Sequence, residues 1–67
     1  MIVLNGRESD LLAGETVASA LECLGLELDA RGVAVAVDGQ VVPRGEWSSF
    51  PLPATAQVEV LTAMQGG

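Results

Sequence analysis

The residues of this chain that can do chemistry are few, and the final pair, Gly66 and Gly67, is the most distinctive. Glycine has no Cβ atom, so a diglycine segment can thread in an extended form through a tunnel too narrow for other residues. It would deliver a single reactive group, the carboxylate of Gly67, to the active site of a partner. The alternative interpretation is an ordinary frayed end, because chain termini are often disordered.

The rest of the sequence offers no catalytic machinery. It has no histidine, which removes the commonest general base and metal ligand. The single cysteine, Cys23, has no histidine to activate it, so we expect a small, partly buried core residue on the flank of the helix and not a nucleophile. Neither the clustered Cys or His of a zinc site nor a phosphate-binding glycine motif is present. We therefore predict that the protein is not an enzyme and has no catalytic residue, metal site or cofactor.

Composition narrows the class of protein. With 67 residues the chain is one small domain, and its net charge is −6, with three arginines and no lysine. This charge argues against binding to nucleic acid or to an anionic membrane, because both need a basic surface on the protein. The acidity serves solubility, although it would also suit a partner with a basic docking surface. No secretory signal or membrane-spanning run is visible, so we expect a cytoplasmic protein.

Three further side chains are candidates for binding. Trp47 and Phe50 could anchor a partner, but we favour Trp47 as a plug at one end of an aliphatic core. Arg44 could pair with an acid, cap backbone carbonyls or act as an interface anchor. The acidic residues near the predicted helix are interpreted as a solvated patch, because charged residues normally stay in water. These acidic residues are Glu22, Glu27 and Asp29.

One amphipathic helix is predicted between residues 17 and 24. Thr16 is a suitable N-cap, because its hydroxyl can accept a hydrogen bond from a backbone N–H of the first turn. Gly25 is a suitable C-terminal cap, because glycine readily adopts a positive φ. Apolar residues recur at i, i+3, i+4 and i+7, which places them on one face. This face consists of Val17, Ala20, Leu21 and Leu24.

Strands are predicted on both sides of the helix. Asp38-Gly39 is the strongest hairpin signal, since a type I′ turn needs a positive φ at both central residues. Pro43 lacks an N–H and therefore ends a strand or lies at a sheet edge. The predicted segments are a hairpin of residues 1–5 and 8–12, a hairpin of 33–37 and 40–42, a helical turn at 44–47 and a last strand at 57–62.

This order predicts an α+β fold, with one helix packed on one face of a mixed four- to five-stranded sheet. If the last strand pairs in parallel with the first, the arrangement is the β-grasp of ubiquitin-like proteins; that pairing is inferred by analogy between folds. Residues 1–63 would form the β-grasp domain. Residues 64–67 would form a flexible C-terminal tail ending in the diglycine.

Four segments resemble the sulfur carrier of bacterial thiamine biosynthesis, the ThiS family. The most specific is VAVAVDGQVVPRGEW at residues 33–47, whose VPR-x-x-W pattern occurs together with the terminal diglycine. The other three are IVLNG at 2–6, GETVASALECLGL at 14–26 and VEVLTAMQGG at 58–67. Two positions depart from the family pattern. Ala54-Thr55-Ala56 stands where Gly-Asp is common, and Met64-Gln65 where shorter or aliphatic residues are usual.

The resemblance implies a ubiquitin-like fold and a defined route for sulfur. An E1-like, ATP-dependent enzyme would adenylate the Gly67 carboxylate, and a sulfur-donor enzyme would convert it to a thiocarboxylate with sulfur from cysteine. Thiazole synthase would then receive the sulfur. Only Gly66, for threading, and Gly67, as the modified residue, carry over as site residues. The alternatives are a carrier for a molybdopterin-type or cysteine-type pathway, a ubiquitin-like protein modifier, or a β-grasp binding module.

Overall fold

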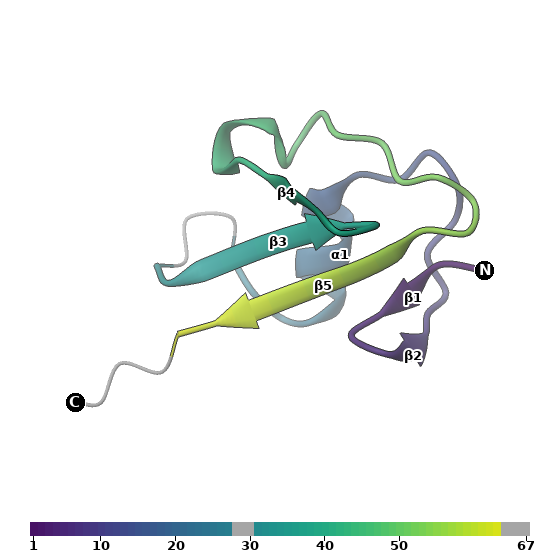
Figure 1. The fold of residues 1–67 in the computed structure, drawn as a ribbon, viewed down its shortest axis with the longest axis horizontal. Coiled ribbons are helices and arrows are strands. Elements are labelled where there is room, and N and C mark those ends of the chain that lie inside the picture. The colour runs from purple at the N-terminus through teal and green to yellow at the C-terminus, as the bar shows by residue number, and fades with distance from the viewer. Residues whose placement is uncertain (28–30, 64–67) are drawn as a thin grey trace.

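The computed structural model describes residues 1–27 and 31–63, and this part of the chain is a five-stranded mixed sheet with one helix on one face (Figure 1). The predicted ubiquitin-like β-grasp is therefore confirmed. The elements are β1 (Val3–Leu4), β2 (Arg7–Glu8), α1 (Val17–Cys23), β3 (Val33–Val37), β4 (Gln40–Val42), the 3-10 turn η1 (Arg44–Glu46) and β5 (Gln57–Thr62).

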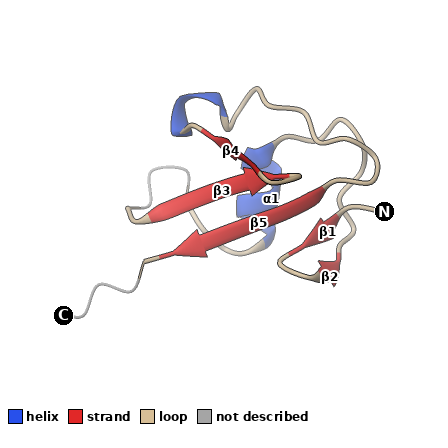
Figure 2. Ribbon diagram, in the orientation of Figure 1, coloured by secondary structure: helices blue, strands red, loops and turns tan. Residues whose placement is uncertain are grey.

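The last strand lies in the middle of the sheet, whose strand order is β2-β1-β5-β3-β4. β5 pairs with β1 in parallel and with β3 antiparallel, so the parallel pairing expected from the fold analogy is confirmed. The helix lies behind the sheet, and η1 follows the edge strand β4 (Figure 2). The chain leaves β5 at the end of the sheet away from the β1–β2 hairpin (Figure 1).

Both hairpins turn on two residues with positive φ. Asp38 and Gly39 have φ of 51° and 83°, which confirms the predicted type I′ turn between β3 and β4. In the first hairpin the prediction of a return strand at residues 8–12 is wrong, because the return strand is Arg7–Glu8. Asn5 and Gly6, with φ of 51° and 80°, make the turn and start the return one residue earlier.

The return strand is also short for a local reason. The backbone N–H and the hydroxyl of Ser9 both donate to the carbonyl of Ile2, at 3.0 and 2.7 Å. These two bonds close the hairpin, and the chain then leads toward the core residue Leu11 instead of continuing beside β1. The strand therefore ends after Glu8.

One adjacent residue and two distant residues accept hydrogen bonds from the backbone N–H groups at the start of α1. The Thr16 hydroxyl accepts from Ser19 N at 3.4 Å, as the N-cap prediction requires. Val17 N donates to the carbonyl of Phe50 at 3.1 Å, and Ala18 N donates to that of Trp47 at 2.9 Å. Free N–H groups at a helix start need such partners. The segment after η1 therefore fixes where the helix lies on the sheet.

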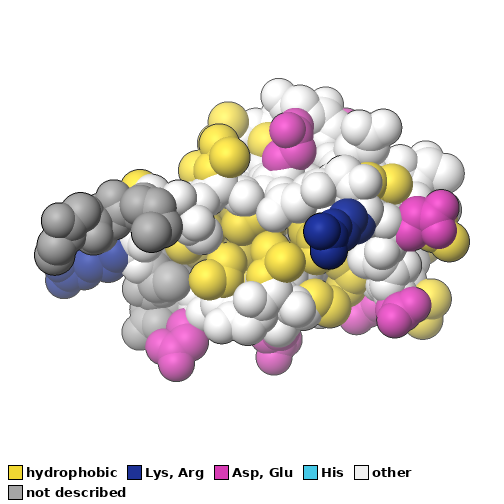
Figure 3. Space-filling model, turned by 90° about the horizontal axis from the view of Figure 1, so that it is seen from below, with side chains coloured by type: hydrophobic (Ala, Val, Ile, Leu, Met, Phe, Trp, Pro, Cys, Tyr) yellow, Lys and Arg dark blue, Asp and Glu magenta, His cyan; other side chains and the backbone are white. Residues whose placement is uncertain are grey.

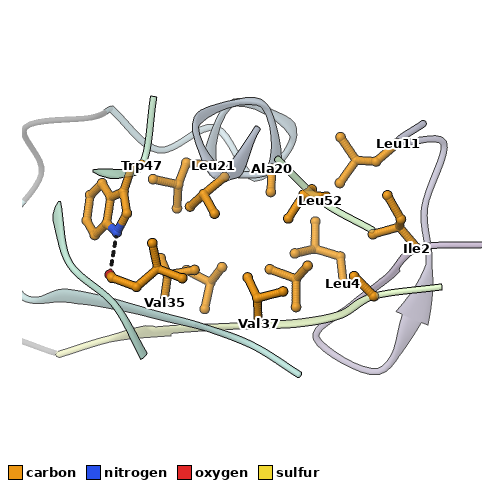
Figure 4. Packing of buried hydrophobic residues seen from close by; sticks show 14 residues of the cluster. Ile2, Leu4, Leu11, Ala20, Leu21, Val35, Val37, Trp47 and Leu52 are labelled. Carbon is orange, nitrogen blue, oxygen red and sulfur yellow. Dashed lines mark hydrogen bonds between the residues drawn. The ribbon is translucent and has the colours of Figure 1, made fainter. Parts of the chain in front are cut away.

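The core lies between α1 and the sheet, and Figure 4 shows it extending from Trp47 at one end to Ile2 at the other. Three of the four residues on the predicted helix face, Val17, Ala20 and Leu21, are fully buried. The prediction for Leu24 is wrong, since its side chain is 40% exposed. Leu24 is the C-cap residue, and beyond it Gly25 (φ 75°) turns the chain so that Leu26 packs against the core instead.

The segment before β5 departs from the family pattern yet leaves the strand intact. Ala56 N donates to the carbonyl of Pro53 at 3.1 Å, which closes a turn over Ala54 and Thr55. Ala56 is fully buried, and its carbonyl accepts from Val3 N at 2.9 Å, so the chain enters β5 already paired with β1.

Candidate functional site

The predicted site residues Gly66 and Gly67, and the predicted tail 64–67, lie outside the described residues. The described part of the site is therefore the place where the chain leaves the sheet. We call this place the tail root and define it as Gly32, Leu61, Thr62 and Ala63. Ala63 is the last described residue and lies four positions before Gly67 in the sequence.

The β3–β5 ladder holds the tail root. The register pairs Val33 with Thr62 and Ala34 with Leu61, and the next contact lies just beyond both strands. There Ala63 N donates to the carbonyl of Gly32 at 2.6 Å. Gly32 has a φ of 70°, and a Cβ atom added to it would lie 3.1 Å from the Cβ of Ala63. The lack of a side chain at Gly32 therefore lets the two backbones meet.

An apolar surface adjoins the tail root on the side of the sheet away from α1. We call it the open face and define it as Ala34, Ala36, Val41 and Leu61. The Val41 and Leu61 side chains are each 71% exposed. The register places Ala34 beside Leu61 and Ala36 beside Val41. These four residues, with Val35 and Glu59, line a shallow hollow of about 130 Å³.

The other edge of β5 is held by the first hairpin. Asn5 N donates to the carbonyl of Val58 at 2.8 Å, and the Asn5 side-chain oxygen accepts from Val60 N at 2.7 Å. The β1–β5 register itself covers only Gln57 and Val58. Asn5 therefore extends the anchoring of β5 toward the tail root, beyond the end of β1.

Two of the predicted binding candidates serve the core. Trp47 is 2% exposed, and its indole Nε1 donates to the carbonyl of Val42 at 2.9 Å, so the favoured prediction of a core plug is confirmed (Figure 4). Phe50 is partly buried against the same core. The guanidinium carbon of Arg44 lies 4.8 Å from the centre of the Trp47 ring, which is a cation–π contact.

The prediction for Cys23 is wrong, because its thiol is exposed and not partly buried in the core. Cys23 is the last residue of α1, two positions beyond the buried Leu21, and this helical spacing turns it away from the sheet.

Glu22 and Glu27 are exposed to solvent, as predicted for charged side chains. Asp29 lies outside the described residues, so a patch formed by all three stays a prediction. On the side of the molecule in Figure 3, acidic side chains are scattered around the margin instead of forming one cluster. Within residues 1–27 and 31–63, no group of three or more His, Cys, Asp or Glu side chains could hold a metal ion. No helix in that part of the chain is long and apolar enough to cross a membrane.

Sequence reasoning missed Gly32, Asn5 and the open face as parts of the site. Alternation along residues 33–37 and 57–62 marks the outward side chains, but it cannot show whether another element covers them. The Ala63 bond to Gly32 and the Asn5 bond to Val60 join residues 31 and 55 positions apart along the chain. Such contacts cannot be predicted from a local sequence pattern.

Comparisons with known proteins identify the family and agree with the fold. The sequence model of the ThiS family matches residues 2–67. A crystal structure of the thiamine biosynthesis protein ThiS from Geobacter metallireducens is 26% identical, with a TM-score of 0.72, covering 98% of this chain and 97% of that one. A solution NMR structure of a thiamine biosynthesis protein from the same organism is 28% identical, with the same TM-score, covering 98% and 86%. Among curated proteins, none matches the chain.

Proposed function

Because this chain belongs to the ThiS family, we propose that it is a sulfur carrier in thiamine biosynthesis that works in the cytoplasm. The observation that carries the proposal is the match of the family model through residue 67, so that it includes the diglycine. The structural relatives named for thiamine biosynthesis support the same assignment. In this proposal the chain is a substrate and handle for other enzymes, and Gly67 is the residue that changes.

The proposed chemistry takes place at the Gly67 carboxylate, because a carboxylate resists nucleophiles at neutral pH until it is activated. An oxygen of the carboxylate attacks the α-phosphate of ATP in the E1-like enzyme, and pyrophosphate leaves. A sulfide equivalent from the sulfur-donor enzyme then attacks the acyl carbon and displaces AMP. The product is a C-terminal thiocarboxylate, whose sulfur is a soft nucleophile that thiazole synthase can use.

The open face supports this proposal because of where it lies. Leu61, one of its two most exposed residues, is only two positions before Ala63, so an enzyme seated there has the tail within reach. From Ala63, the four remaining residues span at most about 14 Å when fully extended. We propose that the E1-like enzyme docks an apolar surface here and receives Gly66 and Gly67 in a narrow channel.

Intact mass spectrometry tests the function. The protein is incubated with the E1-like enzyme of its host, ATP and a sulfur donor, and the exchange of oxygen for sulfur should add about 16 Da. The matched control is Gly67→Ala, which adds a Cβ where the proposed channel leaves no room. We expect its activation to fall at least tenfold, which is about 1.4 kcal/mol of transition-state stabilisation. Absence of the mass gain in the unaltered protein would refute the proposal.

Gene deletion distinguishes the pathways that could receive the sulfur. A carrier for thiazole formation should make its host require thiamine when the gene is deleted, while molybdenum enzymes keep their activity. The reverse pattern would assign the chain to a molybdopterin-type pathway. Isopeptide adducts on other proteins would indicate a modifier, and full function without Gly67 would indicate a binding module.

A further inference from the structure

We propose that Gly32 is a positioning residue for the reaction at Gly67, because its contact with Ala63 sets the point and direction in which the tail leaves the sheet. This inference rests on the proposed function. Gly32 does not touch the reacting carboxylate; it acts through the backbone of Ala63, at the start of the four residues that lead to that carboxylate.

Gly32 and Ala63 lie close together both at their backbones and at their Cβ positions. Ala63 N donates to the Gly32 carbonyl at 2.6 Å, which extends the β3–β5 ladder one step past Thr62. The Cβ of Ala63 would lie 3.1 Å from a Cβ placed on Gly32, which is closer than such atoms normally approach. A side chain at Gly32 therefore requires Ala63 to move by a few tenths of an ångström. This movement shifts the point at which the tail leaves the sheet.

The displacement matters because the remaining chain is short. The four remaining residues span at most about 14 Å, so a shift of their starting point leaves them little spare length for bringing the carboxylate to ATP in a fixed channel. Small misplacements of a reacting group are costly, since a shift of about 1 Å can lower a rate by a factor of about 100. Docking through the open face involves other side chains, so the loss should appear in kcat more than in KM for the carrier.

The chain provides a matched control for backbone strain. Gly25 has a φ of 75°, close to the 70° of Gly32, but a Cβ added to Gly25 would meet no atom within 4 Å. Gly25→Ala and Gly32→Ala therefore force an L-residue into a similar conformation, with a similar loss of stability. Only Gly32→Ala disturbs Ala63.

The experiment measures pyrophosphate release by the E1-like enzyme at varied concentrations of each carrier, with thermal unfolding recorded in parallel. We expect Gly32→Ala to lower kcat about fivefold with KM changed less than about twofold, and Gly25→Ala to leave both near those of the unaltered chain. In a chain that carries Ala63→Gly, which removes the opposing Cβ, Gly32→Ala should cost less than about twofold. The thermal unfolding recorded in parallel separates a rescue of kcat from a recovery of stability.

Several results would overturn the inference. Equal losses of kcat in Gly25→Ala and Gly32→Ala would assign the effect to backbone strain. If Gly32→Ala lowers kcat as much in the chain that carries Ala63→Gly, the contact between residues 32 and 63 is not the cause. If Gly32→Ala does not fold, Ala63→Pro replaces it, because it removes the N–H that bonds Gly32. Activity of Ala63→Pro equal to that of the unaltered chain would then overturn the inference. Failure of the unaltered chain to release pyrophosphate would instead reject the proposed function.

Discussion

The side-chain oxygen of Asn5 accepts a hydrogen bond from the backbone N–H of Val60 at 2.7 Å, across 55 positions of sequence. Asn5 also has a φ of 51°, so the residue that turns the first hairpin is the one that anchors the last strand. Asparagine suits both tasks, because it tolerates the left-handed region and carries a carbonyl oxygen on a short side chain. The hairpin and the strand that leads to the tail are thereby joined.

Removal of this anchor should destabilise the fold measurably. Asn5→Ala leaves the Val60 N–H without its partner, and Val60 is only 6% exposed. We expect a loss of about 2 kcal/mol in the free energy of unfolding, measured by urea denaturation. Asn5→Gly is the control for the backbone, since glycine accepts the positive φ and also lacks the oxygen. If Asn5→Gly matches the unaltered chain, the hydrogen bond contributes nothing and the cost arises from φ alone.

Two leucines of the predicted helix face should respond differently to truncation. Leu21 is fully buried, whereas Leu24 is 40% exposed at the C-cap. Leu21→Ala should therefore cost about 2–5 kcal/mol of unfolding free energy, and Leu24→Ala less than about 1 kcal/mol. Similar costs for the two would mean that Leu24 packs in the core after all. Both values come from the same denaturation series.

Trp47 should contribute through its hydrogen bond as well as its volume. Trp47→Phe removes the indole N–H that donates to Val42 and leaves a void in the core. We expect a loss of about 2–3 kcal/mol in unfolding free energy, again from urea denaturation. Arg44→Gln, which removes the cation above the ring, should cost less than about 1 kcal/mol. A larger effect for Arg44→Gln than for Trp47→Phe would contradict this ranking.

The turn residue Asp38 should tolerate one substitution and not another. Its side-chain oxygen accepts from Gln57 N at 2.9 Å, which fastens the β3–β4 turn to the start of β5. Asp38→Asn keeps an acceptor and the tolerance for positive φ, so we expect less than about 0.5 kcal/mol of destabilisation. Asp38→Ala loses both and should cost about 1–2 kcal/mol, measured by thermal unfolding. Equal stability of the two variants would show that the bond is unimportant.

The open face should affect activation without affecting stability. Leu61→Asp places a charge on a side chain that is 71% exposed, so unfolding free energy should change by less than about 0.5 kcal/mol. KM for the carrier in the activation assay should rise at least tenfold, because a buried, unpaired carboxylate at an interface is costly. Leu12→Asp is the matched control, at 70% exposure and outside the open face. Equal effects of the two variants would contradict docking on this face.

The sequence by itself determined most of the local structure and the class of protein. Thr16 and Gly25 mark the helix ends, and Asp38-Gly39 marks a turn, because capping and positive φ depend on only a few adjacent residues. The family was also accessible, since its motifs are contiguous in the chain. One error lies at the end of the helix. Leu24 continues the spacing of the buried helix residues, but α1 ends before it and its side chain is exposed.

Only the tertiary structure decided which surfaces are covered and which distant residues meet. Alternation places Leu61 and Val41 on one side of their strands, yet α1 packs on the opposite side and leaves them exposed. The contacts of Asn5 with Val60 and of Gly32 with Ala63 arise because the last strand is inserted into the middle of the sheet. Such contacts depend on strand order, which a one-dimensional pattern of side chains does not encode.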